Sequence, residues 1–215
     1  TGNSGQRVRM ANLISTEKQC GGDLASGTHF PKEIRGQLLT CRFKSRAIIR
    51  YEFIEKGSGY TANVLPPLIS SSHPNFRPVD CKIGPDGALY VADWYNPIIN
   101  HAKPNFRDPR RDKDHGRVWR ITAKGRPLVK KPQLVDATIP ELVDQLRSPE
   151  QWNRHQARNV LAERDPDAVA KELATWVTKL DPKDPDHDHH LVEAMWACQN
   201  IERPSEDILK RVLSA

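Results

Sequence analysis

Long apolar runs are missing from this sequence. No stretch approaches the about 18 consecutive apolar residues that a membrane-spanning helix requires. With 37% hydrophobic and 28% charged residues, the composition is typical of a soluble globular protein. The first residues, TGNSGQRV, include neither an initiator Met nor the apolar segment of a signal peptide. We therefore expect a fragment or processed product of a longer protein, without a membrane span in this chain.

Cysteine is scarce and widely spaced. The four cysteines are Cys20, Cys41, Cys81 and Cys198, and no two of them form a CxxC pair. This argues against a zinc knuckle and against a thioredoxin-like motif. The absence of CxxCH excludes covalent attachment of a c-type haem to this chain. A disulfide such as Cys20–Cys41 is open if the protein is exported, but spacing alone does not pair the cysteines.

An uncompensated basic stripe is also missing, although the formal net charge is +6. In the segment RDPRRDKDHGR (107–117), five Lys or Arg residues alternate with three Asp. Nucleic-acid binders more often concentrate positive charge on one surface. We expect no nucleic-acid partner.

Residues 1–122 have the pattern of a β protein. Strand-like runs separated by turn residues occur at 8–14, 36–43, 46–55, 60–66, 79–83, 88–93 and 117–122. Gly57 and Gly59 mark one turn, and Pro85-Asp86-Gly87 marks another. Many short strands at near-regular spacing favour a sandwich, a barrel or a propeller.

Residues 123–137 read as a linker, and residues 138–215 as a helical-repeat segment. Helix starts are predicted at capping boxes over 138–141 and 148–151, at Asp165-Pro166, near Asp184-Pro185 and at Ser205. Short helices with such starts are typical of solenoid repeats. The expected helical core is Trp152, Trp176, Trp196, Leu142, Leu146, Val160, Leu161, Leu173, Leu191 and Met195.

The stretch DPKDPDHDHH (181–190) contains carboxylates and histidines that could ligate zinc. Adjacent residues on a helix point in different directions, however, so they do not form a compact ligand set. Acidic residues at a helix start also stabilise the helix dipole without a metal. We expect no metal site here.

The long connection over 94–116 is the strongest candidate site, because functional loops are commonly held between rigid strands. Asp93, Asn96 and His101 supply a carboxylate, an amide and an imidazole. These groups suit a general base with orienting partners, with Asp93 or His101 as the catalytic residue, or an oxygen-rich metal site. Trp94 is a further candidate for substrate or cofactor contact.

Arginines in the same connection offer a second kind of chemistry. Arg107, Arg110 and Arg111 could bind an anionic substrate, or the carboxylates of a quinone, through bidentate contacts. The alternative is structural, with these arginines paired to Asp108, Asp112 and Asp114 so that the ion pairs hold the loop in place.

Three more candidates lie in loops before strands. His29, His73 and Arg77 would join the site if their loops opened on the same face as His101. Each histidine alone is more typical of a turn-stabilising residue.

Several motifs carry a family resemblance. HPNFRPVDCKIGPDGALYVADWYNPIINH and NFRDPRRDKDHGRVWRITAKGRPLV closely resemble the haem-binding CxxCH "membrane-bound dehydrogenase domain" proteins of planctomycete and verrucomicrobial type. The likeness covers roughly residues 20–200. DWYNPII-H with FRDPRR is its most specific part, whereas GPDG occurs in many propellers.

The resemblance implies a glucose/sorbosone dehydrogenase-like β-propeller, then HEAT-like repeats, then a cytochrome c domain. A propeller of six blades at about 40 residues each needs about 240 residues, so residues 1–122 would hold the last two or three blades. The CxxCH domain is not in this chain.

By this resemblance, a periplasmic or otherwise exported protein would oxidise a sugar or alcohol and pass electrons to the haem domain. Quinone and Ca²⁺ are possible cofactors of the full protein, and haem c would sit on the missing domain. The alternative is a non-catalytic propeller and solenoid scaffold that binds carbohydrate or protein.

Overall fold

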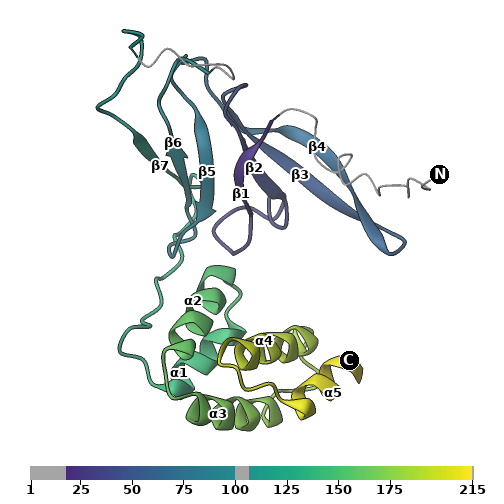
Figure 1. Ribbon diagram of the computed structural model, residues 1–215. Helices are drawn as coiled ribbons and strands as arrows, with labels where there is room; N and C mark the ends of the chain where they lie inside the picture. The colour runs from purple at the N-terminus through teal and green to yellow at the C-terminus, as the bar shows by residue number, and fades with distance from the viewer. Residues whose placement is uncertain (1–17, 100–106, 215) are drawn as a thin grey trace, which may run out of the picture. The chain divides into compact units, whose positions relative to one another are not determined.

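The computed structural model describes residues 18–99 and 107–214, and the chain divides into two compact units. Thr1–Leu128 is β-rich, and Val129–Ala215 is helical. Figure 1 shows the two sheets of the first unit and the helices of the second. A β-rich region followed by an all-helical region was the coarse prediction from sequence, and it is confirmed.

The β-rich unit contains two antiparallel sheets. The larger has the order β1-β2-β3-β4, with bounds β1 (Cys20–Leu24), β2 (Leu38–Arg42), β3 (Ala47–Lys56) and β4 (Gly59–Ser70). The smaller has the order β5-β6-β7, with bounds β5 (Pro78–Ile83), β6 (Leu89–Asp93) and β7 (Arg117–Ile121). Within each sheet, every strand therefore pairs with its neighbour in sequence.

Turn chemistry explains where the strands reverse. Lys56 pairs with Gly59, which leaves a two-residue turn in which Gly57 has φ +60°. In the β5–β6 turn, Gly87 has φ +78° and donates to the carbonyl of Gly84. Glycine adopts this left-handed conformation without the steric cost of a Cβ.

Six of the seven strand runs expected from sequence correspond to β2 through β7. The run expected at 8–14 lies outside the described residues. β1 was missed because its sequence, CGGDL, has two glycines and no apolar alternation. Its pairing with β2 and its packing against β5 stabilise it instead.

An apolar core fills the space between the two sheets. Its buried members are Ala25, Phe30, Leu39, Cys41, Ile48, Cys81, Ile83, Leu89 and Val91. Side chains alternate across each strand, so every second residue of β2, β5 and β6 points into this layer. Each fully buried Leu or Val contributes about 1.5–3 kcal/mol relative to exposure.

The helical unit contains α1 (Ile139–Asp144), the short 3-10 helix η2 (Gln145–Arg147), α2 (Gln151–Ala162), α3 (Pro166–Thr178), α4 (His187–Asn200) and α5 (Glu206–Ser214). The Asp165 side chain accepts from the N–H of Ala168, as its predicted capping role requires. At α1 the Glu141 carboxylate accepts from the Thr138 N–H at 2.8 Å. The box predicted over 148–151 is wrong in position, since Ser148 accepts from the N–H of Glu150 and the helix begins only at Gln151.

Most of the expected helical core is buried. The fully packed members are Leu142, Leu146, Leu161, Leu173, Trp176 and Leu191, and Trp152, Val160 and Met195 pack at its edge. Trp196 is an exception, because 40% of it is exposed and the Arg158 guanidinium lies 5.4 Å from its ring. Among the helices that the structure describes, none is long and apolar enough to cross a membrane.

Candidate functional site

Strand pairing gathers several predicted residues at one end of the three-stranded sheet. β5 starts where β6 ends, with Pro78 opposite Asp93, and β7 starts at Arg117 opposite the same Asp93. The segments 71–77, 94–99 and 107–116 therefore meet there, and we call this the loop end. It includes His73, Arg77, Asp93, Trp94, Asn96, Arg107, Arg110 and Arg111.

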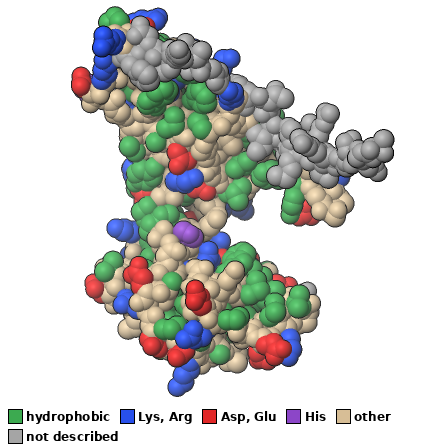
Figure 2. Space-filling view, in the orientation of Figure 1, with side chains coloured by type: hydrophobic (Ala, Val, Ile, Leu, Met, Phe, Trp, Pro, Cys, Tyr) green, Lys and Arg blue, Asp and Glu red, His purple; other side chains and the backbone are tan. Residues whose placement is uncertain are grey.

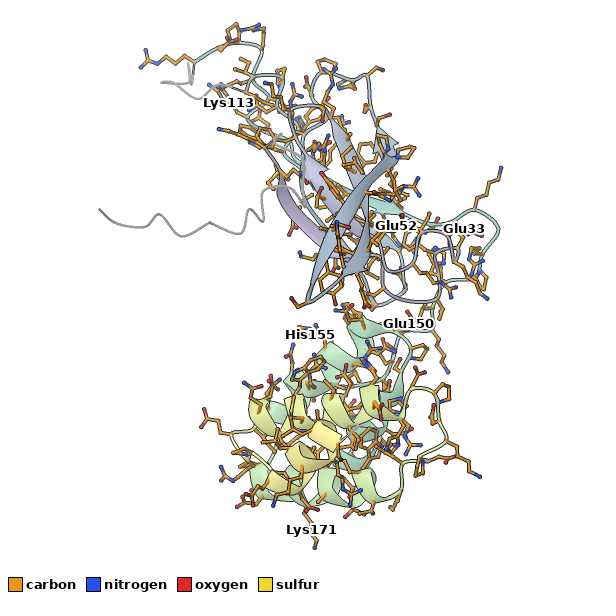
Figure 3. All side chains as sticks on the ribbon, turned by 90° about the vertical axis from the view of Figure 1, so that its right-hand side faces the viewer. Glu33, Glu52, Lys113, Glu150, His155 and Lys171 are labelled. Atoms are coloured by element: carbon orange, nitrogen blue, oxygen red, sulfur yellow. The ribbon has the colours of Figure 1, made fainter. Side chains whose placement is uncertain are left out.

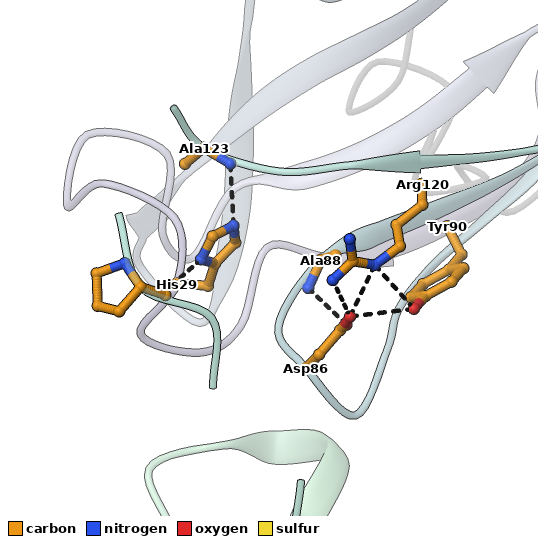
Figure 4. A network of polar contacts seen from close by, with 7 residues as sticks. His29, Asp86, Ala88, Tyr90, Arg120 and Ala123 are labelled. Atoms are coloured by element: carbon orange, nitrogen blue, oxygen red, sulfur yellow. Dashed lines mark hydrogen bonds and ion pairs between the residues drawn. The ribbon is translucent and has the colours of Figure 1, made fainter. Parts of the chain in front are cut away.

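His29 is not part of the loop end. Its Nε2 accepts from the N–H of Ala123 at 2.9 Å, and its Nδ1 donates to the carbonyl of Pro127 at 2.8 Å (Figure 4). Both partners follow β7, at the other end of the sheet. Figure 3 shows the same separation, with Lys113 of the loop end far from Glu33 of the His29 loop. His29 is 2% exposed and joins two segments that are far apart in the sequence, which differs from the local, turn-stabilising role given as its alternative.

Asp93 is a buried carboxylate whose two oxygens both accept hydrogen bonds. Oδ1 accepts from the N–H of Arg77 at 2.7 Å and of Tyr95 at 2.9 Å. Oδ2 accepts from the indole Nε1–H of Trp119 at 3.0 Å. Only 4% of the residue is exposed, whereas a general base must reach the proton that it removes. In this arrangement Asp93 holds three chain segments together.

Arg77 fastens the loop end to the larger sheet. Within the loop end, its guanidinium donates to the carbonyls of Asn96 at 2.9 Å and Pro97 at 3.3 Å. In the β2–β3 turn of the larger sheet, it donates to the carbonyls of Phe43 at 3.1 Å and Lys44 at 3.3 Å. Burial, with a smaller effect from nearby Arg46, lowers the pKa of Arg77. Its donors are thus directed to backbone acceptors and away from an external anion.

Asn96 has a local role in the same place. Its Oδ1 accepts from the N–H of Ile98 at 3.0 Å, and the residue is 5% exposed. The side chain therefore shapes the turn that begins the long connection. His101, the other predicted catalytic residue, lies outside the described residues, and its role stays a prediction.

Aspartates hold the charged part of the connection in a defined shape. Asp108 binds Arg110 through both oxygens, at 3.0 and 2.8 Å, and the Arg110 hydrogen bonds lower the pKa of Asp108 to about 2. Asp112 accepts from the backbone of Asp114 and from the backbone and ring of His115, which lowers its pKa. The structural alternative paired Asp108, Asp112 and Asp114 with arginines of the connection. The contacts of Asp108 agree with it, whereas Asp112 accepts from His115 and from backbone N–H groups.

The same segment lines a shallow polar depression of about 590 Å³, formed by residues 107–115 and Asn75. Figure 2 shows Lys and Arg side chains at this end of the β-rich unit. Arg107 and Arg111 line the depression, and both engage in interactions within the chain.

A row of flat side chains lies at the loop end, and we call it the stacked row: His73, Arg117 and Trp119, which are exposed, and Tyr95, which is half-buried. The His73 and Tyr95 rings are parallel within 16°, with centroids 5.9 Å apart. The Arg117 guanidinium lies 3.7 Å from the Tyr95 ring centroid and 5.6 Å from that of Trp119. Asp93 positions two members of the row, Tyr95 through its N–H and Trp119 through its indole.

Sequence reasoning found only His73 among these four. The pattern did hold a usable signal, because Arg117 lies opposite Asp93 and Trp119 is two residues further on the same face of β7. Tyr95 was not predictable in this way, since it has φ +53°, outside the strand conformation. Trp94, which was predicted, is 48% exposed at the same end.

Comparison with known families places the strands in one domain. Residues 4–125 match the family described as a domain of unknown function, DUF7133. The chain belongs to this family. No curated protein and no solved structure matches the chain. The DUF7133 match spans β1 through β7 and therefore the whole loop end.

Within the described part of the DUF7133 domain and the helical unit, no group of three or more His, Cys, Asp or Glu side chains could hold a metal ion. Ca²⁺ takes about 6–8 oxygen ligands. The oxygens of Asp93 and the Oδ1 of Asn96 instead accept N–H groups, so these residues do not form such a cage. In the 181–190 segment, Asp181 and Asp184 accept backbone N–H groups of the turn that precedes α4.

Proposed function

We propose that the DUF7133 domain is a carbohydrate-binding module without catalytic activity of its own, and that the stacked row is its contact surface. The observation that supports this is the row itself, in which three of the four members are exposed and a buried carboxylate positions Tyr95 and Trp119. A sugar ring has a face of C–H groups and a rim of hydroxyls. The exposed Trp119 ring can pack against the C–H face, while Arg117 and His73 can hydrogen-bond to hydroxyls.

The depression beside the row extends the proposed site. Its Arg and Lys side chains donate hydrogen bonds and its Asp side chains accept them, which suits the mixed donor and acceptor rim of a sugar chain. Asp108 and Asp112 hold this segment in shape before a ligand arrives. A site shaped in advance loses less conformational entropy when it binds.

At the level of fold, we propose that the two sheets are neighbouring blades of a propeller and that the helices are HEAT-like repeats. Consecutive antiparallel pairing in both sheets supports the first part. The larger sheet also has buried residues on both faces, with Ile48 toward the smaller sheet and Ala47, Ile49 and Tyr51 on the other side. A blade between two neighbours has this property. Short helices around one apolar core support the second part.

The oxidoreductase implied by the family resemblance is a second candidate. It would place the protein outside the cytoplasm, use His101 as the base and pass electrons to a haem domain. The specific observation in its favour is that the connection containing His101 starts beside the stacked row, where a bound sugar would lie.

Binding to a panel of immobilised oligosaccharides tests the first proposal. We expect Tyr95→Ala and Arg117→Ala to weaken binding at least about tenfold, which corresponds to about 1.4 kcal/mol. Tyr60→Ala is the matched control, because Tyr60 is an aromatic residue of the same domain, 60% exposed on the β3–β4 hairpin. Equal binding by all three variants, or no binding to any glycan, would overturn the proposal.

The two candidates separate in a dye-reduction assay with quinone, Ca²⁺ and the same sugars. The binding module predicts no turnover. Turnover that His101→Ala abolishes would establish the oxidoreductase and contradict the non-catalytic assignment.

A further inference from the structure

Three of the four cysteines converge between the two sheets, although they are far apart in the sequence. Cys20 is in β1, Cys41 in β2 and Cys81 in β5. Cys20 and Cys41 are directly opposite in the β1–β2 ladder. Cys81 belongs to the other sheet, and its thiol reaches across to the carbonyl of Leu39 in β2 at 3.8 Å, two residues from Cys41. Cys198 is in α4, in the helical unit.

The sheets approach each other closely at this place. Packed sheets are ordinarily about 10 Å apart, whereas a disulfide requires Cα atoms about 4.4–6.8 Å apart. A Cβ on Gly21, next to Cys20, would lie only 2.4 Å from the Cα of Asp80, next to Cys81. Here the backbones of β1 and β5 meet without intervening side chains.

Polar contacts fix this approach independently of the thiols. The Asp23 Oδ2 accepts from the N–H of Ile83 at 2.9 Å, and the Lys82 ammonium donates to the carbonyl of Gly22 at 2.6 Å. Both contacts join β1 to β5. Because β1 pairs with β2, and the Cys81 thiol contacts the carbonyl of Leu39 in β2, these contacts also hold Cys81 beside the strand of Cys41.

We propose that Cys41 and Cys81 form a disulfide that links the two sheets, acquired as the chain folds in the presence of a low-molecular-weight disulfide. The Cys81 thiolate attacks the small disulfide, forms a mixed disulfide and releases one thiolate. The Cys41 thiolate then attacks the protein sulfur of the mixed disulfide and releases the second. Two protein thiols are oxidised, one disulfide is reduced to two thiols, and the protein's two protons end on the released thiolates.

Burial explains why the bond forms during folding. Cys41 is 0% exposed and Cys81 is 1% exposed, so an oxidant does not reach them in the folded domain. The neighbouring Cys81 thiol, together with burial, also raises the pKa of the Cys41 thiol, which suppresses the reactive thiolate. Cys20 is only partly buried, but burial raises its pKa too. The reduced folded protein is thus expected to resist the reagent that oxidises the folding chain.

The test is to unfold and reduce the full chain, then refold it in a buffer of oxidised and reduced glutathione. After denaturation and thiol titration, we expect two free thiols in place of four. Digestion without reductant and mass spectrometry should show the peptide of Cys41 joined to that of Cys81. Four remaining thiols, or a Cys20–Cys41 link, would overturn the proposal.

A variant with Cys20→Ala and Cys198→Ala provides the matched control, because it retains only the proposed pair. It should lose both thiols on refolding, and retention of both would contradict the proposal. A sample of wild-type protein that is folded first under reduction and then given the same buffer should keep four thiols for much longer. Equally fast loss would contradict the folding-coupled route.

Discussion

Asp93 offers the sharpest test of whether the loop end is held by its buried carboxylate. In Asp93→Asn the amide oxygen can still accept from the N–H groups of Arg77 and Tyr95. The amide nitrogen, however, would face the indole N–H of Trp119, so two donors would oppose each other and the indole would lose its acceptor. An unsatisfied buried donor costs about 1–3 kcal/mol. Because Trp119 is 42% exposed, water can offset part of the loss, and we expect about 1–2 kcal/mol.

Asp93→Ala removes the acceptor of all three donors. Two of them are backbone N–H groups, that of Arg77 just before β5 and that of Tyr95 at the start of the connection, and alanine offers neither of them an acceptor. Because losses in one network are not fully additive, we expect a total of about 3–5 kcal/mol. Tyr95 and Trp119 would both lose their fixed positions in the stacked row, so glycan binding should fall together with stability.

Hydrogen exchange followed by mass spectrometry is the suitable assay, because it separates the two units of the chain. Peptides from β5 to β7 should exchange faster in the variants, and peptides from α2 and α3 should not change. Trp119→Phe gives the decisive comparison, since it removes the indole donor. In the Trp119→Phe background, Asp93→Asn should lower the free energy of unfolding by about 1 kcal/mol less than it does in the wild type. The same loss in both backgrounds would show that the indole donor does not depend on the Asp93 carboxylate.

Three other predictions concern buried polar groups, each with its own control or contradicting result. His29→Ala should destabilise the DUF7133 domain by about 1–3 kcal/mol in the exchange assay, since the Ala123 N–H loses its partner, whereas His73→Ala should not. Glu193→Gln should destabilise the helical unit by about 3–5 kcal/mol, because Arg154 and Arg158 lose their buried counter-charge. Asp167→Asn removes one partner of an exposed ion pair and should leave the stability unchanged. Urea unfolding followed by circular dichroism at 222 nm measures both variants. Burial lowers the pKa of His190, against the weaker opposing effect of Asp184, so the folded state favours the neutral ring. The stability that the neutral ring contributes is therefore fully present above the unfolded pKa of about 6.5 and falls as the pH drops below it. The same urea midpoint for the helical unit at pH 7.5 and at pH 5 would contradict this.

The alternation of apolar residues predicted most strands, because β2, β3, β5 and β6 each bury one face against a neighbouring sheet. β1 escaped prediction for a physical reason. Gly21 is needed where the backbone approaches β5, and this approach depends on residues about 60 positions away, as in the contact of Lys82 with Gly22. Local propensity contains no information about such a contact.

The connection between β6 and β7 was recognised from its length and charge, and Asp93 and Arg77 do lie at its base. The contacts that these two residues make were not apparent from the sequence. Most of their partners are backbone groups, namely the N–H groups of Arg77 and Tyr95 for Asp93 and several carbonyls for Arg77. A sequence shows which side chains can bind a ligand, but it does not show which backbone groups will reach them first.

Isotope-edited NMR of the 24.4 kDa chain, titrated with the oligosaccharide that gives the strongest panel signal, shows whether a sugar contacts the stacked row. We expect saturable shifts of the Trp119 indole N–H and of the Tyr95 and Arg117 amides, with the Tyr60 amide unchanged. Shifts confined to other parts of the chain, or none at saturating sugar, would contradict the assignment of the stacked row as a binding surface.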